Sequence, residues 1–190
     1  MKCLVITVLS LLISPLVVAG EITGFNNYMF GDPLSKFLND PSFSCAIDKS
    51  SKFGEYKCTK NKPGTEMIAG KRLNWLELQF AWNTKQLRYI YVIYLDSNDY
   101  PDVLDYSSFV PAETSQIKQL LTEKYGEPED YCGIKGCSDL IWRRDASMGE
   151  PYIHLNASEI RFAIKRDSED GKLTDADKKR MDEYDGINKR

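Results

Sequence analysis

The sequence predicts an α+β fold in which helices pack on one face of an antiparallel β-meander sheet. Residues 75–82 and 86–95 alternate between apolar and polar side chains, the pattern of strands with one buried face. Residues 111–125 instead repeat apolar side chains at helical spacing. The expected order is a helix, four strands, a helix and three strands. It suggests two tandem halves of one domain, at about residues 25–97 and 105–165.

The start of the chain predicts a secretory signal peptide over residues 1–19. Lys2 precedes a nearly unbroken apolar run, and small residues occupy the positions before an expected cleavage point after Ala19. The alternative is a membrane anchor, but the run is shorter than the roughly 20 residues that span a bilayer. Cys3 lies too early to be a lipobox cysteine, so we expect neither a lipid anchor nor a stable membrane span after cleavage.

Length and composition narrow the class of protein. The 190 residues are 42% hydrophobic and 28% charged, which fits a folded globular domain and excludes collagen-like and low-complexity chains. The formal net charge of −3 gives no electrostatic reason to expect nucleic acid as a partner. We expect a single domain over residues 20–165, followed by a charged C-terminal segment, residues 166–190, that contributes little to folding.

Four cysteines remain after removal of the signal peptide, at Cys45, Cys58, Cys132 and Cys137. An even number in an exported protein indicates disulfides, and four cysteines allow three pairings. A hairpin around the turn at residues 49–54 would join Cys45 to Cys58. A short glycine-bearing loop would likewise let Cys132 pair with Cys137. A zinc site is the alternative, but the usual CxxC pairs are missing, and no metal is expected.

Local signals define the ends of the two helices. Residues 31–38 predict a short helix with Asp32 as its N-cap and Pro33 in its first turn. The second helix is expected to end at Gly126, with Pro128 just beyond it. Three further strands are expected at residues 140–143, 152–155 and 160–164.

The register of the hairpin predicts which side chains share a face. If Trp82 and Gln86 close its turn, Leu78 lies opposite Ile90 and Phe80 lies opposite Arg88 on the side that faces the helices. The other side mixes aromatic and polar groups, as protein-binding surfaces do. We therefore predict a binding surface made of Trp75, Glu77, Gln79, Tyr89 and Tyr91; the alternative is that a loop, the charged C-terminal segment or a dimer contact covers this side.

The sequence also resembles small secreted bacterial proteins. The segments that carry this resemblance are residues 31–34, Cys45, residues 56–58, residues 121–128 (LTEKYGEP) and Trp142. Their order is similar to that of the β-lactamase-inhibitor-protein-like architecture, which is shared by a small outer-membrane-assembly lipoprotein. The resemblance implies helix and β-meander units, and a partner protein bound on the open face of the sheet.

No motif compels an enzymatic activity. His154 is the single histidine, so any mechanism that needs an imidazole must use it, yet it alternates with apolar residues as an ordinary strand residue does. Residues 170–177 resemble the second half of a calcium-binding loop, but Arg166 occupies the first ligand position and Ser168 the third. We expect no cofactor and consider an enzyme less favoured than a binding protein.

The sequence thus favours a soluble bacterial binding protein of inhibitor or immunity type, periplasmic or secreted, that acts by non-catalytic contact with another protein of the cell envelope. One alternative is a secreted hydrolase that uses paired carboxylates, for which Asp and Glu are abundant. The other is a structural partner of an envelope assembly.

Overall fold

The computed structural model describes residues 20–48, 55–94, 112–130, 139–143, 145–156, 158–165 and 179. The expected signal peptide, the Cys132–Cys137 pairing, the calcium-like loop and almost all of the charged C-terminal segment lie outside these residues.

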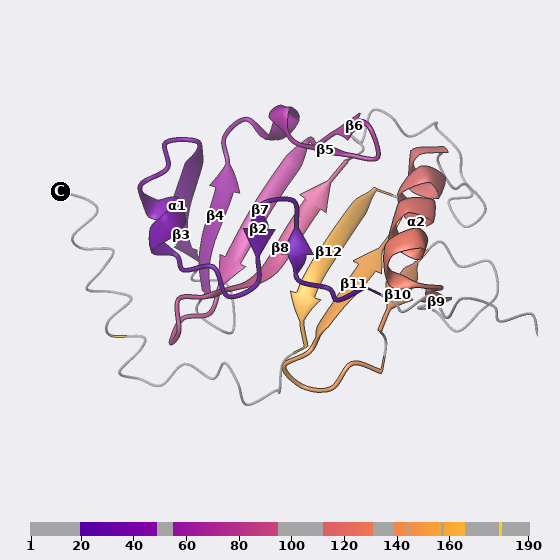
Figure 1. The fold of residues 1–190 in the computed structure, drawn as a ribbon. Helices are drawn as coiled ribbons and strands as arrows, with labels where there is room; N and C mark the ends of the chain where they lie inside the picture. Colours follow the sequence, from indigo (N-terminus) through magenta and orange to yellow (C-terminus); the bar gives the residue numbers. More distant parts are fainter. Residues whose placement is uncertain are drawn as a thin grey trace, which may run out of the picture.

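The centre of the fold is an eight-stranded sheet in which every neighbouring pair is antiparallel (Figure 1). In spatial order its strands are β3 (Phe43–Asp48), β4 (Glu55–Lys60), β7 (Trp75–Phe80), β8 (Leu87–Ile93), β12 (Glu159–Ile164), β11 (Pro151–Leu155), β10 (Leu140–Trp142) and β9 (Glu129–Asp130). The predicted mostly antiparallel α+β fold is therefore confirmed. The four strands of the N-terminal part meet the four of the C-terminal part where β8 pairs with β12.

Several short elements accompany the eight-stranded sheet. Two small hairpins were not expected from the sequence: β1 (Gly24–Phe25) with β2 (Tyr28–Met29), and β5 (Met67–Ile68) with β6 (Lys71–Arg72). Residues Pro63–Thr65 form a short 3₁₀ turn, η1. The first hairpin turns at Asn26, whose φ of 50° is a conformation that asparagine tolerates.

The first helix is shorter than predicted. Helix α1 spans Ser35–Leu38, and Asp32 does not cap it. The backbone of Asp32 accepts a hydrogen bond from the Leu87 amide at 2.8 Å, and its carboxylate accepts one from the Met29 amide at 2.9 Å. Because this segment is extended against the start of β8, the helix begins only after it.

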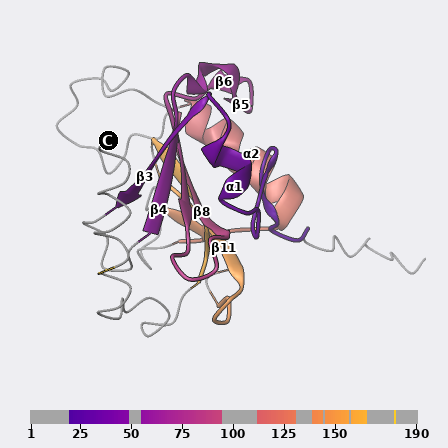
Figure 2. The ribbon, with the colours of Figure 1, turned by 90° about the vertical axis from the view of Figure 1, so that its left-hand side faces the viewer.

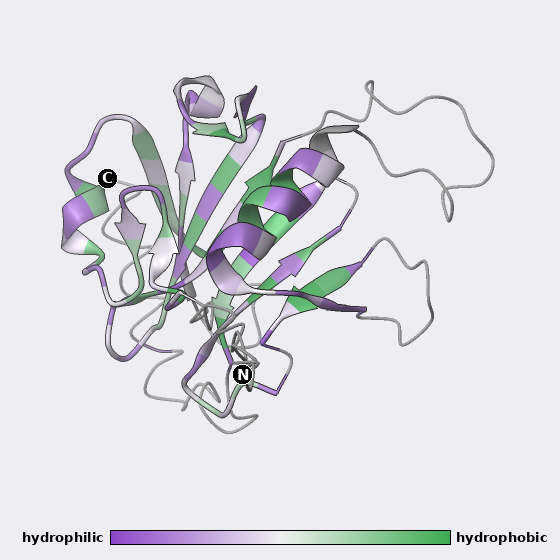
Figure 3. Cartoon of the chain, turned by 45° about the vertical axis from the view of Figure 1, so that its right-hand side comes forward, coloured by the Kyte–Doolittle hydropathy of each residue, from purple (hydrophilic) through white to green (hydrophobic). Residues whose placement is uncertain are grey.

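The second helix agrees with its sequence signals. Helix α2 spans Ala112–Tyr125, and Gly126 follows in a left-handed conformation with φ of 87°. The Gly126 amide donates to the Thr122 carbonyl at 2.9 Å, which closes the last turn. Ile117 and Leu121 are buried, and Figure 3 shows the alternation of hydrophobic and hydrophilic residues around this helix.

The register of the β7–β8 hairpin is as predicted except at its closed end. Leu78 pairs with Ile90, but Phe80 pairs with Leu87 rather than with Arg88. A bulge leaves Arg88 without a direct partner across the strands, and it places the fully buried Leu87 in the core. The expected register would have directed a guanidinium into an apolar layer, where an unpaired charge is strongly disfavoured.

The core lies on one face of the sheet. Cys58, Leu78, Ile90, Phe162, Ile153 and Trp142 form a cross-strand row of buried side chains. The Phe37 ring of α1 packs on Phe80 with its centroid 5.3 Å away. At the edge of this layer Cys45 lies opposite Cys58, and the predicted disulfide between them is present.

Candidate functional site

The opposite face of the sheet carries polar and aromatic side chains, and we call it the polar face. It results from strict alternation along β4, β7, β8, β12 and β11, because successive strand residues point to opposite sides. Its members are Lys57, Trp75, Glu77, Gln79, Tyr89, Tyr91, Tyr152, His154, Glu159 and Arg161. All five residues predicted as a binding surface are among them.

Cross-strand pairing explains why these residues meet. Glu77 pairs with Tyr91, which pairs on its other side with Arg161, and Arg161 pairs with His154. Gln79 lies opposite Tyr89 in the neighbouring row. Lys57 of β4 lies opposite Gln79, so the face is one continuous surface over five strands rather than a feature of the β7–β8 hairpin alone.

One cluster of polar side chains on this face surrounds the buried carboxylate of Glu77. Glu77 is only 7% exposed, and its Oε1 accepts a hydrogen bond from Gln79 Nε2 at 2.8 Å. Lys57 Nζ lies 3.4 Å from the same oxygen and 3.0 Å from Asp48 Oδ2. Partial burial acts to lower the pKa of Lys57, but the hydrogen bond to Asp48 and the charge of Glu77 outweigh it, so the pKa is raised. The lysine is a fixed cation at neutral pH.

A second cluster joins β8 to β12. The Tyr91 hydroxyl donates to one oxygen of Glu159, and Arg161 forms an ion pair with the other. The Arg161 guanidinium also lies over the Tyr91 ring, 5.7 Å from its centroid, which is a cation–π arrangement. Burial, together with the hydrogen bond to Glu159, raises the pKa of Tyr91 to about 12. Its hydroxyl is therefore a neutral donor at any physiological pH.

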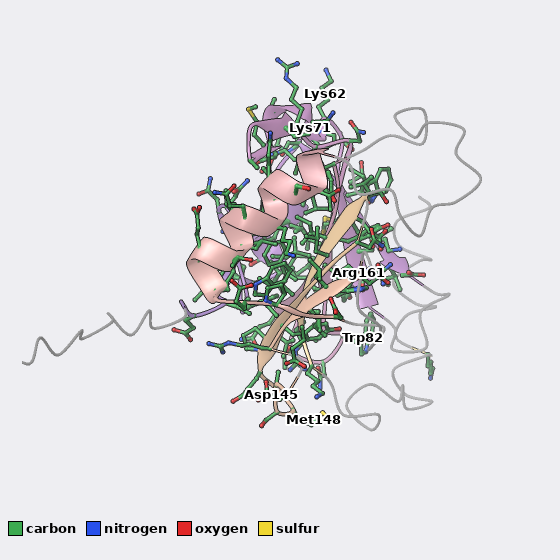
Figure 4. All side chains as sticks on the ribbon, turned by 90° about the vertical axis from the view of Figure 1, so that its right-hand side faces the viewer. Lys62, Lys71, Trp82, Asp145, Met148 and Arg161 are labelled. Atoms are coloured by element: carbon green, nitrogen blue, oxygen red, sulfur yellow. A yellow bond between two sulfur atoms is a disulfide. The ribbon has the colours of Figure 1, made fainter. Side chains whose placement is uncertain are left out.

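The outward groups of the polar face differ in charge from the inward ones. The side chains of Lys57 and Arg161 are 34% and 41% exposed, whereas those of Glu77 and Glu159 are 9% and 12% exposed. Figure 4 shows Arg161 on the side of the sheet away from α2. A molecule that approached this face would meet the two cations and the 40%-exposed Trp75 before it met the carboxylates.

His154 lies at the β11 end of the polar face. Its Nε2 is 3.9 Å from Asp139 Oδ2. Burial lowers its pKa, although the charge of Asp139 acts in the opposite direction. Cys45 and Cys58 are joined in a disulfide, so neither thiol is available to this histidine as a nucleophile.

Each of the two glutamates of this face is in contact with a cation. Lys57 contacts Glu77, and Arg161 and Tyr91 both contact Glu159. Within the described ranges, no three His, Cys, Asp or Glu residues gather as metal ligands would.

A separate hollow of about 150 Å³ lies on the helix side of the sheet. Phe162 forms part of its lining, and β1, β5, α2 and the turn residues Asn26 and Ala69 contribute the rest. Met67 and Leu120, both in the lining, are 49% and 42% exposed. Of the described lining residues only Lys124 is charged, and none of them belongs to the polar face.

Comparisons with family models, with curated proteins and with solved structures gave no match to this chain. Over the part of the chain that the structure describes, no helix has the length and apolar character needed to cross a membrane.

Sequence reasoning missed several members of the polar face. Arg161 and Glu159 alternate with apolar residues in β12, which indicates an outward side, but no local signal places β12 beside β8. Lys57 alternates with Tyr56 and Cys58 in β4 in the same way. These residues join the site only through the pairing of strands from distant parts of the chain.

Proposed function

We propose that this protein is an exported bacterial binding protein of inhibitor or immunity type, periplasmic or secreted, that holds another protein against its polar face without catalysis. The signal-peptide pattern and the Cys45–Cys58 disulfide support export, because disulfides persist in oxidising compartments. The observation that carries the binding proposal is the composition of the polar face.

Three kinds of residue dominate the binding energy of protein interfaces: Trp, Tyr and Arg. The polar face carries Trp75, Tyr89, Tyr91, Tyr152 and Arg161 on four adjacent strands. None of these side chains belongs to the apolar core on the other face. Arg161 is held by Glu159 and by the Tyr91 ring, so less side-chain entropy is lost when a partner binds it.

The proposed partner presents carboxylates next to an apolar patch. Lys57 and Arg161 are the more exposed members of their ion pairs, and their carboxylate partners lie deeper. Acidic groups on the partner would meet these cations, while an apolar patch would cover Trp75. Glu77 and Gln79 then act as supports that fix the position of Lys57.

The proposal also requires that the helices leave this face accessible. Two contacts support such an arrangement: Phe37 of α1 packs on Phe80, and Leu121 of α2 lines the same hollow as Phe162. Phe80 and Phe162 both belong to the core face. In the edge view of Figure 2, α1 and α2 lie on the same side of the sheet.

The test compares two variants in capture of a partner and in stability. Wild-type protein is immobilised, a periplasmic extract is passed over it, and the retained protein is purified and titrated against each variant by calorimetry. We expect Tyr91→Ala to weaken the affinity roughly tenfold or more, because an anchor of this kind contributes about 2 kcal/mol. Leu120→Ala removes an exposed side chain from the helix side and serves as the control.

Equal affinity of the wild-type protein and the folded Tyr91→Ala variant would refute the proposed surface. Loss of binding in Leu120→Ala instead would move the interface to the helix side. Turnover of a substrate by the wild-type protein, abolished by a carboxylate substitution, would favour the hydrolase alternative.

A further inference from the structure

The C-terminal end of α2 holds the residue that follows the expected cleavage point. The Gly20 nitrogen lies 2.8 Å from the Lys124 carbonyl oxygen and donates a hydrogen bond to it. Lys124 is in the last turn of the helix, where carbonyl groups lack partners from within the helix. The residue four positions further on, which would supply that partner, is Pro128, and proline has no backbone N–H.

The contact is also too close for any residue but glycine. A Cβ atom added to Gly20 would lie 2.8 Å from the same Lys124 oxygen, which is a backbone atom and cannot move aside easily. Glycine at this position therefore has a packing reason, independent of its place after a cleavage motif.

We propose that α2 has a built site for a terminal ammonium group, and that removal of residues 1–19 supplies this group at Gly20. Hydrolysis of the Ala19–Gly20 peptide bond consumes one water: the hydroxyl joins the Ala19 carbonyl carbon, and a proton joins the Gly20 nitrogen. At neutral pH the products are a carboxylate on the released peptide and a positive α-ammonium on the mature chain. This inference rests on the proposed export and goes beyond it.

The hydrogen bond from the Gly20 nitrogen to the Lys124 carbonyl differs in charge between the precursor and the mature chain. In the precursor a neutral amide N–H donates the hydrogen bond. After cleavage a cation occupies the same position, at the negative end of the helix dipole. The end of α2 is fixed around it, because Trp142 Nε1 donates to the Gly126 carbonyl at 2.8 Å.

Next to this contact in the sequence stand three acidic residues and one basic residue. Glu123 on α2, Glu127 just after it and Glu21 beside Gly20 are acidic. Lys124 opposes them, but its Nζ lies over the Tyr125 ring, 4.9 Å from the centroid. We therefore expect the Gly20 ammonium to bind its proton about two- to fivefold more tightly than an unfolded N-terminus does.

The test uses mature protein that begins at Gly20, prepared with a free amine and with an N-acetyl group. Acetylation keeps an N–H donor and removes only the charge, so it is the matched control. We expect the free-amine form to unfold about 1–3 °C higher at pH 6.5 and low salt, and the difference to vanish at pH 10. Gly20→Ala should lower the transition of both forms, because it displaces the nitrogen.

Two results would overturn the proposal. Equal transition temperatures of the free and acetylated forms at pH 6.5 would show that the charge has no partner at α2. Mass spectrometry of the exported protein that finds a first residue other than Gly20 would show that the cell does not make this terminus. The second result would also bear on the cleavage point, whereas the first would leave export untouched.

Discussion

Removal of the Cys45–Cys58 disulfide should lower the free energy of unfolding by an amount that depends on the length of the loop it closes. The cross-link joins two strands at a sequence separation of 13. In the chain-entropy model a loop of this size restricts the unfolded chain by about 3 kcal/mol. Cys58 is also fully buried, so truncation to alanine adds on the order of 1 kcal/mol for the cavity left behind.

The assay separates these two contributions. In the chain that begins at Gly20, a Cys132→Ala/Cys137→Ala background leaves only the pair of interest, and urea unfolding is followed with and without reductant. Reduction opens the loop but keeps both sulfur atoms, whereas Cys45→Ala/Cys58→Ala also removes them. With an m-value of about 2 kcal/mol/M, reduction should lower the midpoint by about 1.5 M, and the double substitution slightly more.

A reduced protein whose midpoint falls by less than about 0.3 M would refute this reasoning. Such a result would mean that the unfolded chain already holds β3 and β4 close together, so that the cross-link restricts little. If the Cys45→Ala/Cys58→Ala substitution lowered the urea midpoint strongly and reduction did not, the loss of stability would come from packing around Cys58 alone.

Two further predictions concern single side chains. Leu78→Ala should lower the free energy of unfolding by about 2–5 kcal/mol in chemical unfolding, because loss of the buried side chain leaves a cavity between Cys58 and Ile90. Tyr91→Ala should lower this free energy clearly less. Equal losses of free energy in the two variants would place Tyr91 in the core. His154 has a lowered pKa in the folded state, so below about pH 6.5 the unfolded chain binds more protons and stability should fall as the pH falls. Because His154 is the single histidine, NMR titration of its ring should give a pKa below 6.5, and His154→Gln should flatten the decline of melting temperature between pH 7 and pH 5; a ring pKa above 6.5 would contradict this account.

The short-range features of this fold follow from the sequence. The alternation in residues 75–82 and 86–95 assigns Leu78 to one face and Glu77 to the other, since a strand has a period of two wherever it pairs. The end of α2 at Gly126 follows from the conformational freedom of glycine. The hairpin between β3 and β4 brings Cys45 and Cys58 together because the two strands are close neighbours in the sequence.

Other features depend on contacts that no local pattern contains. Asp32 has the residue type of an N-cap, yet its backbone pairs with Leu87 and the helix begins later. The bulge beside Phe80 exists because Leu87 fills the core better than Arg88 would. In each case a tertiary contact outweighs a local preference worth about 1 kcal/mol or less.

The candidate site divides in the same way. The sequence determined that Trp75, Glu77, Gln79, Tyr89 and Tyr91 lie on one side of a hairpin. Only the tertiary structure decided that β12 pairs with β8, and this pairing brings Arg161 over Tyr91 and Glu159 to its hydroxyl. The physical reason is that side-chain alternation fixes the two faces of a strand. The choice of neighbouring strand depends instead on which strands bury their apolar faces together, and here Tyr91 and Glu159 are more than sixty residues apart in the chain.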